Sequence, residues 1–376
     1  MRRNLMFSAV AVGLTLAAAL ACAERLPSAQ ASPPTPSATS SASPDRLSLP
    51  PPRPGHARPL VVILADNAAT ETTDFTIPYG VLKDADVADV VSVSTHPGPV
   101  RLQMALRILA DQTVSQFDAA HPEGADLVVV PFLPNPDKAA LGAWLRGQYA
   151  RGATILSICA GARNLAEAGL LGGRRATTHW HFIGPLEKAY PRTTWVRDRR
   201  YVQDGRIIST TGVSASIPAS LAVVEAMAGR ERAAQVAARM GVSSWSAAHH
   251  SADFPFAAPD LAEAGMTLAS PWNHERLEAP VAAGFDEVAL ALTADAWSAT
   301  YRASIATTSP TTAPIRSRHG LLLLADARPA AHPRLLPRHG GAPVAQFDLA
   351  FADIARRYGP ASARVAAKGL EYPRGP

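Results

Sequence analysis

Residues 152–163 constrain the fold of this chain more than any other stretch. They predict a short buried strand at 153–158, which leads into Cys159, two small residues and a helix. The small residues Ala160 and Gly161 allow a sharp turn of the backbone and the close approach of a ligand. A cysteine here lies beside the amide groups that open the next helix, and their partial positive charge favours the reactive thiolate. Taken alone, however, Cys159 fits better with a small buried hydrophobic residue, which is what most free cysteines are.

Strands and helices alternate around this stretch, over residues 58–245. Apolar runs predict buried strands at 60–64, 90–94 and 127–130, and amphipathic stretches predict helices between them. This pattern indicates an α/β sandwich with a largely parallel sheet. Function in such folds lies at the carboxyl ends of the strands, where Cys159 is placed.

The first 57 residues predict export and a tether. Residues 1–23 combine a basic start at Arg2 and Arg3 with an apolar run and small residues. Three endings stay open: a cleaved signal peptide, a lipoprotein signal that leaves Cys22 lipidated, or an uncleaved anchor. Residues 24–57, rich in Pro, Ser and Ala, predict a disordered linker. We therefore expect an extracytoplasmic protein, anchored at the bacterial cell membrane if the lipid or the apolar run is retained.

Composition argues against several other functions. The formal net charge is +5, but the basic residues are scattered along the chain, so we expect no nucleic-acid partner. The chain has two cysteines, and once Cys22 is removed or lipidated, Cys159 is left as a single thiol. The pair His249-His250 with Asp253 is weak evidence for a metal site, and we expect neither a metal nor a cofactor.

Four motifs follow one another in a specific order and spacing. They are Ser157-Ile158-Cys159-Ala160-Gly161-Ala162, Leu165-Ala166-Glu167-Ala168-Gly169-Leu170-Leu171, Gly173-Arg174-Arg175-Ala176-Thr177-Thr178-His179-Trp180 and Thr211-Gly212-Val213-Ser214-Ala215. With them, residues 58–245 resemble the PfpI-type branch of the class I glutamine amidotransferase-like superfamily. That superfamily includes isonitrile hydratases, deglycase-type proteins and the sensor halves of AraC-type regulators. The resemblance implies a flavodoxin-like α/β/α sandwich.

The resemblance also implies three catalytic residues. Cys159 falls on the elbow nucleophile, Asp74 on the acid that hydrogen-bonds its sulfur, and His179 on the histidine near that thiol. A carboxyl group that faces a thiolate has a raised pKa and can shuttle a proton, and an imidazole can activate the sulfur. Alternatives stay open: Asp74 could only cap its helix, Glu71 is a rival acid, and His179 could be a core histidine.

For the oxyanion site, the resemblance implies the backbone N–H of Ala160 and one from Phe132 or Leu133. The chain departs from its relatives here, because Phe132 and Leu133 stand where many have a Gly pair, and Ala160 stands where isonitrile hydratases commonly have Thr. Amidotransferases also need a His-x-Glu run after the cysteine. The run 121–123 precedes it, so glutamine hydrolysis is not expected.

Residues 246–376 predict a partial repeat of the first unit. The segment 314–326 matches 99–111 in its spacing from Pro to Asp, and the helical stretch 347–368 matches 217–240. The repeat has no elbow cysteine, so we expect it to pack against the first unit and shape its pocket. It lacks a basic recognition helix, unlike the DNA-binding half of AraC-type regulators.

Together these features predict an exported cysteine-dependent hydratase, hydrolase or lyase that acts on a small aldehyde, isonitrile or acyl compound. The alternative is a ligand- or redox-sensing module without turnover and without a DNA-binding domain. The resemblance implies a small-molecule partner and a homodimer, although the second unit could replace the partner surface.

Overall fold

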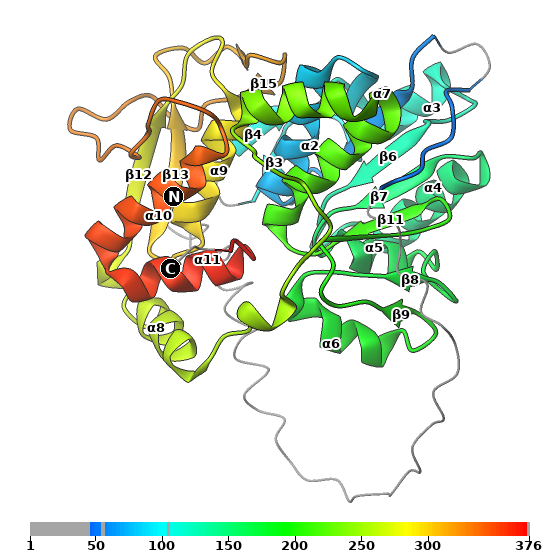
Figure 1. Cartoon of the computed structure of the whole chain (residues 1–376). Coiled ribbons are helices and arrows are strands. Elements are labelled where there is room, and N and C mark those ends of the chain that lie inside the picture. The colour runs from blue at the N-terminus through cyan, green and yellow to red at the C-terminus, as the bar shows by residue number, and fades with distance from the viewer. Residues whose placement is uncertain (1–45, 54–56, 104–105, 374–376) are drawn as a thin grey trace, which may run out of the picture.

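The computed structural model describes residues 46–53, 57–103 and 106–373. Its main feature is a seven-stranded sheet in the order β10-β11-β7-β6-β1-β2-β5 (Figure 1). The strands are β1 (Leu60–Ala65), β2 (Asp89–Ser94), β5 (Gln112–Thr113), β6 (Leu127–Val130), β7 (Thr154–Ser157), β10 (Tyr201–Asp204) and β11 (Ile207–Thr210). Every neighbouring pair is parallel except the edge hairpin β10-β11. The run β2-β1-β6-β7-β11 has the 2-1-3-4-5 order of flavodoxin-like folds, so the predicted fold class is confirmed.

Helices cover both faces of this sheet, because alternate residues of a buried strand point to opposite faces. Val61 and Ile63 of β1 pack into one core with α2 and α7, whereas Val62 and Leu64 pack into a second core with α3, α4 and α5. These helices are α2 (Thr72–Ala85), α3 (Val114–Ala120), α4 (Lys138–Ala150), α5 (Gly161–Glu167) and α7 (Ser216–Met240). The elbow that carries Cys159 lies between β7 and α5, at the carboxyl edge of the sheet.

A second, smaller α/β unit packs beside the first (Figure 1). Its elements are α8 (Ala258–Leu268), β12 (Glu275–Pro280), α9 (Glu287–Ser298), β13 (Ala303–Thr308), α10 (Ala345–Tyr358) and α11 (Pro360–Gly369). Strands β12 and β13 are parallel, and α9 connects them as α2 connects β1 and β2. Helix α9 packs against α2, so the two units share one apolar core.

The two units also share details of backbone and side-chain structure. In the first, β3 (Val100–Leu102) and β4 (Leu106–Leu109) form a hairpin, and in the second, β14 (Ile315–Arg316) and β15 (Leu322–Leu323) do the same. Strand β15 pairs antiparallel with β4, which joins the hairpins into a four-stranded sheet. In each unit an aspartate, Asp111 or Asp326, accepts hydrogen bonds from the N–H and hydroxyl of the residue 19 positions before it.

Part of the expected linker packs against the first unit. Leu47 is buried in the core, Ser48 exchanges two hydrogen bonds with the side chain of Gln203, and Arg53 donates to the carbonyl of Ala125. Residues 46–53 are therefore held because they bury apolar surface and satisfy backbone carbonyls. The export signal, Cys22 and the rest of the linker up to residue 45 lie outside the described residues. In the described ranges, no helix is both long and apolar enough to cross a bilayer.

Candidate active site

Cys159 occupies a strained turn at the carboxyl end of β7. Its φ angle is +54°, in the left-handed region that non-glycine residues rarely adopt. Two threonines hold this conformation: the Cys159 N–H donates to Thr210 Oγ1 at 3.0 Å, and the Thr178 hydroxyl donates to the Cys159 carbonyl at 3.1 Å. The side chain is buried, with the residue only 5% exposed. The elbow predicted from the sequence is thus present, and it is closed to solvent.

Gly161, one of the two small residues after Cys159, is needed for close packing rather than for the turn itself. A Cβ atom on Gly161 would lie 2.3 Å from the carbonyl oxygen of Val130, which is closer than two such atoms can approach. The residue with a positive φ in this turn is Cys159 itself. Gly161 is required because α5 begins against the end of β6.

Asp74 faces the elbow from the first turn of α2, and Glu71 caps that helix. The Glu71 carboxylate accepts from the Asp74 N–H, which leaves the Asp74 side chain free of the capping role. Asp74 is fully buried: Oδ2 accepts from the Phe132 N–H at 3.1 Å, and the carboxyl group also hydrogen-bonds the Glu71 side chain. Burial raises the pKa of Asp74 well above its ordinary value, and the neighbouring Glu71 raises it further. Asp74 is therefore positioned as a protonated acid.

A third acid comes from the second unit and was not anticipated from the sequence. Asp295 on α9 is 2% exposed and accepts a hydrogen bond from Thr73 Oγ1 at 2.8 Å. Burial raises its pKa well above the ordinary value, and Glu71 adds to that effect. Three carboxyl groups thus share one buried region beside the elbow, where they cannot all carry a charge.

The expected oxyanion donors are largely engaged by side chains. The Phe132 N–H donates to Asp74, and the Leu133 N–H donates to Asn164 Oδ1 at 3.1 Å. Asn164 in turn donates to the Leu133 carbonyl, which fixes this loop against α5. The Ala160 N–H hydrogen-bonds the Cys159 sulfur and works to lower its pKa. The assignment of Phe132 or Leu133 as a free donor therefore needs correction for this closed state, because buried backbone N–H groups take the nearest acceptor.

His179 lies near the elbow, but both of its ring nitrogens have other partners. It caps α6 (Trp180–Ala189), where Nδ1 accepts from the His181 N–H at 3.2 Å. Nε2 lies 3.0 Å from the Gly369 carbonyl, which makes Nε2 the protonated nitrogen. In this state His179 holds the C-terminal segment and does not hydrogen-bond the thiol.

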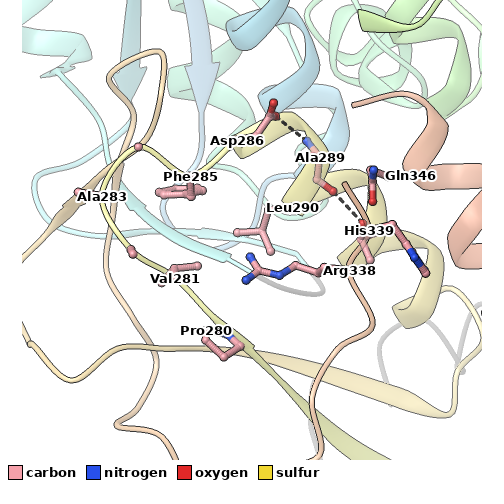
Figure 2. A pocket seen from close by; sticks show the side chains of 13 residues that line it. Pro280, Val281, Ala283, Phe285, Asp286, Ala289, Leu290, Arg338, His339 and Gln346 are labelled. Atoms are coloured by element: carbon pink, nitrogen blue, oxygen red, sulfur yellow. Dashed lines mark hydrogen bonds between the residues drawn. The ribbon is translucent and has the colours of Figure 1, made fainter. Parts of the chain in front are cut away.

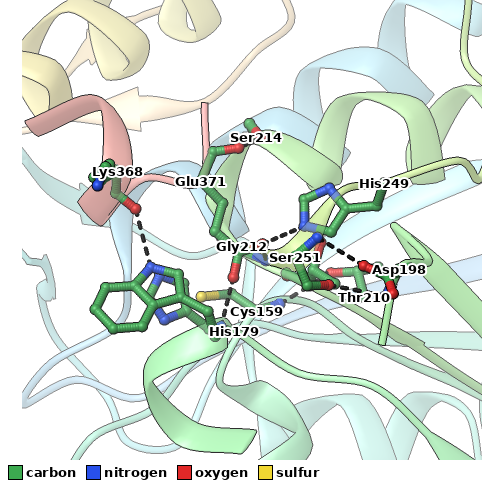
Figure 3. Close-up of polar contacts among 12 residues, drawn as sticks. Cys159, His179, Asp198, Thr210, Gly212, Ser214, His249, Ser251, Lys368 and Glu371 are labelled. Atoms are coloured by element: carbon green, nitrogen blue, oxygen red, sulfur yellow. Dashed lines mark hydrogen bonds and ion pairs between the residues drawn. The ribbon is translucent and has the colours of Figure 1, made fainter. Parts of the chain in front are cut away.

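That C-terminal segment, residues 368–371, covers the site, and we call it the closing segment. Figure 3 shows Glu371 reaching down beside Cys159 and His179. The Glu371 side chain is 1% exposed, accepts from the N–H groups of Gly212 and Trp180, and lies 3.2 Å from His249 Nε2. No motif marks Glu371 in the sequence, since its partners lie 159 and 191 residues away.

The charges around Cys159 oppose ionisation of its thiol. Burial raises the pKa of Cys159 well above its ordinary value, and the carboxyl groups of Asp74, Glu71 and Glu371 raise it further wherever they are ionised. For Glu371 itself, burial works to raise the pKa, but His249, His179 and two backbone N–H donors outweigh it and hold the pKa below its ordinary value. A carboxylate thus faces a neutral thiol. Among the described residues no three His, Cys, Asp or Glu side chains are grouped as metal ligands.

Comparison with known proteins gives a consistent picture for the first unit. A sequence model of the DJ-1/PfpI family matches residues 59–226. Protein DJ-1alpha of Drosophila melanogaster is 30% identical over 189 residues, which cover 49% of this chain and 84% of that protein. Isonitrile hydratase of Pseudomonas putida is 32% identical over 166 residues, 43% of this chain and 68% of that enzyme. The HTH-type transcriptional regulator CdhR of Pseudomonas aeruginosa is 40% identical over 147 residues, 38% of this chain and 42% of the regulator.

Proposed function

The chain belongs to the DJ-1/PfpI family, and we propose that it is a cysteine-dependent enzyme in which Cys159 adds to a small electrophile. The observation that carries this proposal is that an unusual backbone at Cys159 and a buried acid, Asp74, occur together at the elbow. Cys159 keeps a left-handed backbone, and Asp74 keeps a fully buried carboxyl group with a raised pKa. Both features cost free energy, and a cysteine that only fills the core needs neither.

The same arrangement supports a balanced addition step. With an aldehyde, the Cys159 sulfur forms a bond to the carbonyl carbon, and the carbonyl π bond breaks. Asp74, protonated because of its raised pKa, donates its proton to the new oxyanion and takes up the proton that leaves the thiol. The product of this step is a hemithioacetal on Cys159. With an isonitrile the corresponding adduct is a thioimidate, and with an acyl compound it is a thioester formed as the leaving group departs with a proton. Water then attacks either adduct and releases the product and the Cys159 thiol.

Access to Cys159 requires the closing segment to move. It is held by the Ser214 N–H, which donates to the Leu370 carbonyl at 3.1 Å, and by Trp180 Nε1, which donates to the Lys368 carbonyl at 3.0 Å. His179 donates to the Gly369 carbonyl, so movement of the segment also frees the imidazole. We propose that the open state is the reactive one, with His179 turned toward the sulfur.

The test combines alkylation with turnover. Burial raises the pKa of Cys159 above the ordinary thiol value of about 8.5. We therefore expect the rate at which iodoacetamide alkylates Cys159 to keep rising as the pH increases beyond that value. Asp74→Asn replaces a neutral carboxylic acid by a neutral amide of similar size, so alkylation at pH 9 should change by no more than about threefold. Turnover of methylglyoxal, cyclohexyl isonitrile or p-nitrophenyl acetate should fall about a hundredfold in the same variant, because the proton donor is lost.

The controls are Cys159→Ser, which should abolish turnover, and Asp253→Asn, an exposed aspartate whose replacement should change neither rate. Equal losses of alkylation and turnover in Asp74→Asn would mean a structural role for Asp74. If the wild type turns over none of the three probes, the enzymatic proposal fails.

A redox- or ligand-sensing module is the second candidate, and the closed site favours it. A thiol that is 5% exposed and neutral suits a response that occurs only when the segment opens. Peroxide would convert the thiol to a sulfenic acid with release of water. Consumption of one equivalent of peroxide per chain, without turnover of any of the three probes, would support the sensing module over the enzyme.

We also propose that the protein is exported, on the strength of Arg2, Arg3 and the apolar run that follows them. Expression of the full chain in a bacterial host, followed by fractionation and mass measurement, tests this. A processed chain outside the cytoplasm is expected. Cys22→Ala should release the protein from the membrane if Cys22 is lipidated, and an unprocessed cytoplasmic chain would refute export.

A further inference from the structure

The Glu371 carboxylate lies in a set of hydrogen-bond donors, which we call the cradle: the N–H groups of Gly212 and Trp180 and the Nε2 atom of His249. The Gly212 N–H donates to Oε2 at 2.9 Å, and the Trp180 N–H donates to Oε1 at 2.5 Å. His249 Nε2 lies 3.2 Å from Oε2, and the His249 and Glu371 side chains are 4% and 1% exposed. Both oxygens of one carboxylate are therefore bound by donors from three separate parts of the chain.

The cradle is built on the two loops that also hold the elbow. Thr178 and Thr210 fix the backbone of Cys159, and each stands two residues before a cradle donor, Trp180 or Gly212. Figure 3 shows the side chain in the cradle reaching down beside this cysteine. Burial has the largest effect in raising the pKa of the thiol, but the carboxylate in the cradle is also close enough for its charge to raise it. A carboxylate in the cradle is thus held next to the reacting sulfur.

Gly212 leaves the space that the carboxylate fills. Its φ angle of −60° is one that any residue adopts, so the backbone does not require a glycine here. A Cβ atom on Gly212 would lie 2.7 Å from Cβ and Cγ of Glu371 and 2.8 Å from its Cδ, closer than carbon atoms approach without a bond. Any side chain at this position would therefore fill the cradle.

The closing segment holds Glu371 in the cradle at a conformational cost. The φ angle of Glu371 is +49°, in the left-handed region that is unfavourable for a residue with a side chain. Burial works to raise the pKa of Glu371, but His249, His179 and the two N–H donors outweigh it and keep the pKa below its ordinary value. The cradle therefore favours an ionised carboxylate, and a free carboxylate bound in its place would not carry the backbone strain.

A cavity of about 600 Å³ lies in the second unit, after β12 and beside α9 (Figure 2), but the polar groups described there have separate partners. Asp286 accepts from the Ala289 N–H, His339 lies 2.6 Å from Asp353, and Arg338 is exposed. These groups do not converge on one ligand, whereas the donors of the cradle meet at one carboxylate.

We propose that the cradle is the carboxylate subsite of the active site: the electrophile that Cys159 takes carries a carboxylate, and Glu371 occupies its place in the closed state. A small 2-oxo acid such as glyoxylate meets this requirement. The sulfur bonds to its aldehyde carbon, the carbonyl π bond breaks, and the thiol proton passes through Asp74 to the new hydroxyl, so a hemithioacetal forms without a co-reactant. The inference rests on the proposed function in that Cys159 is the nucleophile.

Iodoacetate and iodoacetamide are matched probes, because they differ only in a carboxylate against an amide. With either one, the Cys159 sulfur bonds to the methylene carbon, iodide leaves and the thiol proton passes to solvent. The ratio of the two alkylation rates is measured in the full chain with Glu371→Ala, which empties the cradle, and with Glu371→Ala and Gly212→Ala together, which fills it. Neither variant has the Glu371 charge, so repulsion of iodoacetate by that charge does not enter the comparison. We expect the iodoacetate-to-iodoacetamide ratio to be at least tenfold higher with the empty cradle, as for hydrogen bonds to a charged group.

Glu231→Ala, at an exposed position of α7, is the control and should keep the wild-type ratio. A second measurement uses the wild type and so does not depend on the folding of a variant. Glyoxylate and methylglyoxal share an aldehyde, and only glyoxylate carries a carboxylate. Glyoxylate should protect Cys159 from iodoacetamide at a concentration at least tenfold lower, after each is scaled by its effect on N-acetylcysteine.

An equal ratio in the single and double variants, or equal protection by the two aldehydes, would overturn the proposal. Because alkylation and protection need no turnover, they separate this inference from the enzymatic proposal. A raised ratio without turnover of any probe, glyoxylate included, would support the carboxylate subsite and refute the enzyme. Turnover of methylglyoxal with an equal ratio would support the enzyme and overturn the subsite.

Discussion

Replacing Glu371 by alanine is expected to raise the rate at which iodoacetamide alkylates Cys159 at pH 8 by about ten- to a hundredfold. Two effects act in the same direction. Loss of the carboxylate removes one of the negative charges that raise the thiol pKa, and each unit of pKa is a tenfold change in thiolate. The closing segment also loses its hydrogen bonds to the Gly212 and Trp180 N–H groups, so it opens more often.

Alkylation is quenched at successive times, and mass spectrometry of the samples gives its rate. Peptide mapping shows that the label is on Cys159. Glu371→Gln keeps the size of the side chain and removes its charge, so it should fall between the wild type and the alanine variant. Glu231→Ala, on an exposed turn of α7, is the control and should not change the rate. A thermal midpoint near that of the wild type excludes general unfolding. If Glu371→Ala leaves alkylation unchanged, the closing segment does not control access to the thiol.

The sequence predicted the parts of this site that lie in continuous motifs. Cys159 is recognisable because a buried strand, small residues and a helix follow one another locally, and Asp74 because the resemblance places it on the acid that hydrogen-bonds the sulfur. Glu71, the rival acid, takes the helix-capping role that is the alternative for Asp74. Glu71 and Asp74 both lie where a side chain can cap the start of α2, so their spacing along the chain does not decide which of them is the cap.

The missing parts depend on contacts between the two units. Asp295 contacts Thr73 across 222 residues, and Glu371 contacts Gly212 across 159. The repeat predicts that the second unit packs against the first, but residues 295 and 371 lie outside the repeated segments 314–326 and 347–368. The occupied N–H groups of Phe132 and Leu133 were equally hidden, because they depend on where Asp74 and Asn164 point.

Asp295 and Glu371 both reach the site from the second unit, so that unit contributes acids to the site and also stabilises it. Trp297 tests whether these two contributions are linked. It is fully buried on α9, two residues after Asp295, with its ring 5.3 Å from that of Tyr358 in an edge-on contact. Trp297→Ala should lower the free energy of unfolding by about 3–5 kcal/mol, the cost of deleting a large buried aromatic side chain.

Denaturant unfolding measured in parallel by circular dichroism and by Cys159 alkylation gives both effects. Because α9 packs against α2 and carries Asp295, we expect the two probes to shift together to lower denaturant in Trp297→Ala. Trp272→Ala is the matched control: Trp272 is 77% exposed, and its loss should change stability by no more than about 0.5 kcal/mol. If circular dichroism shifts while Cys159 stays protected, the units unfold separately. The second unit would then be an attached domain, and the acids it contributes would not be needed to keep the thiol closed.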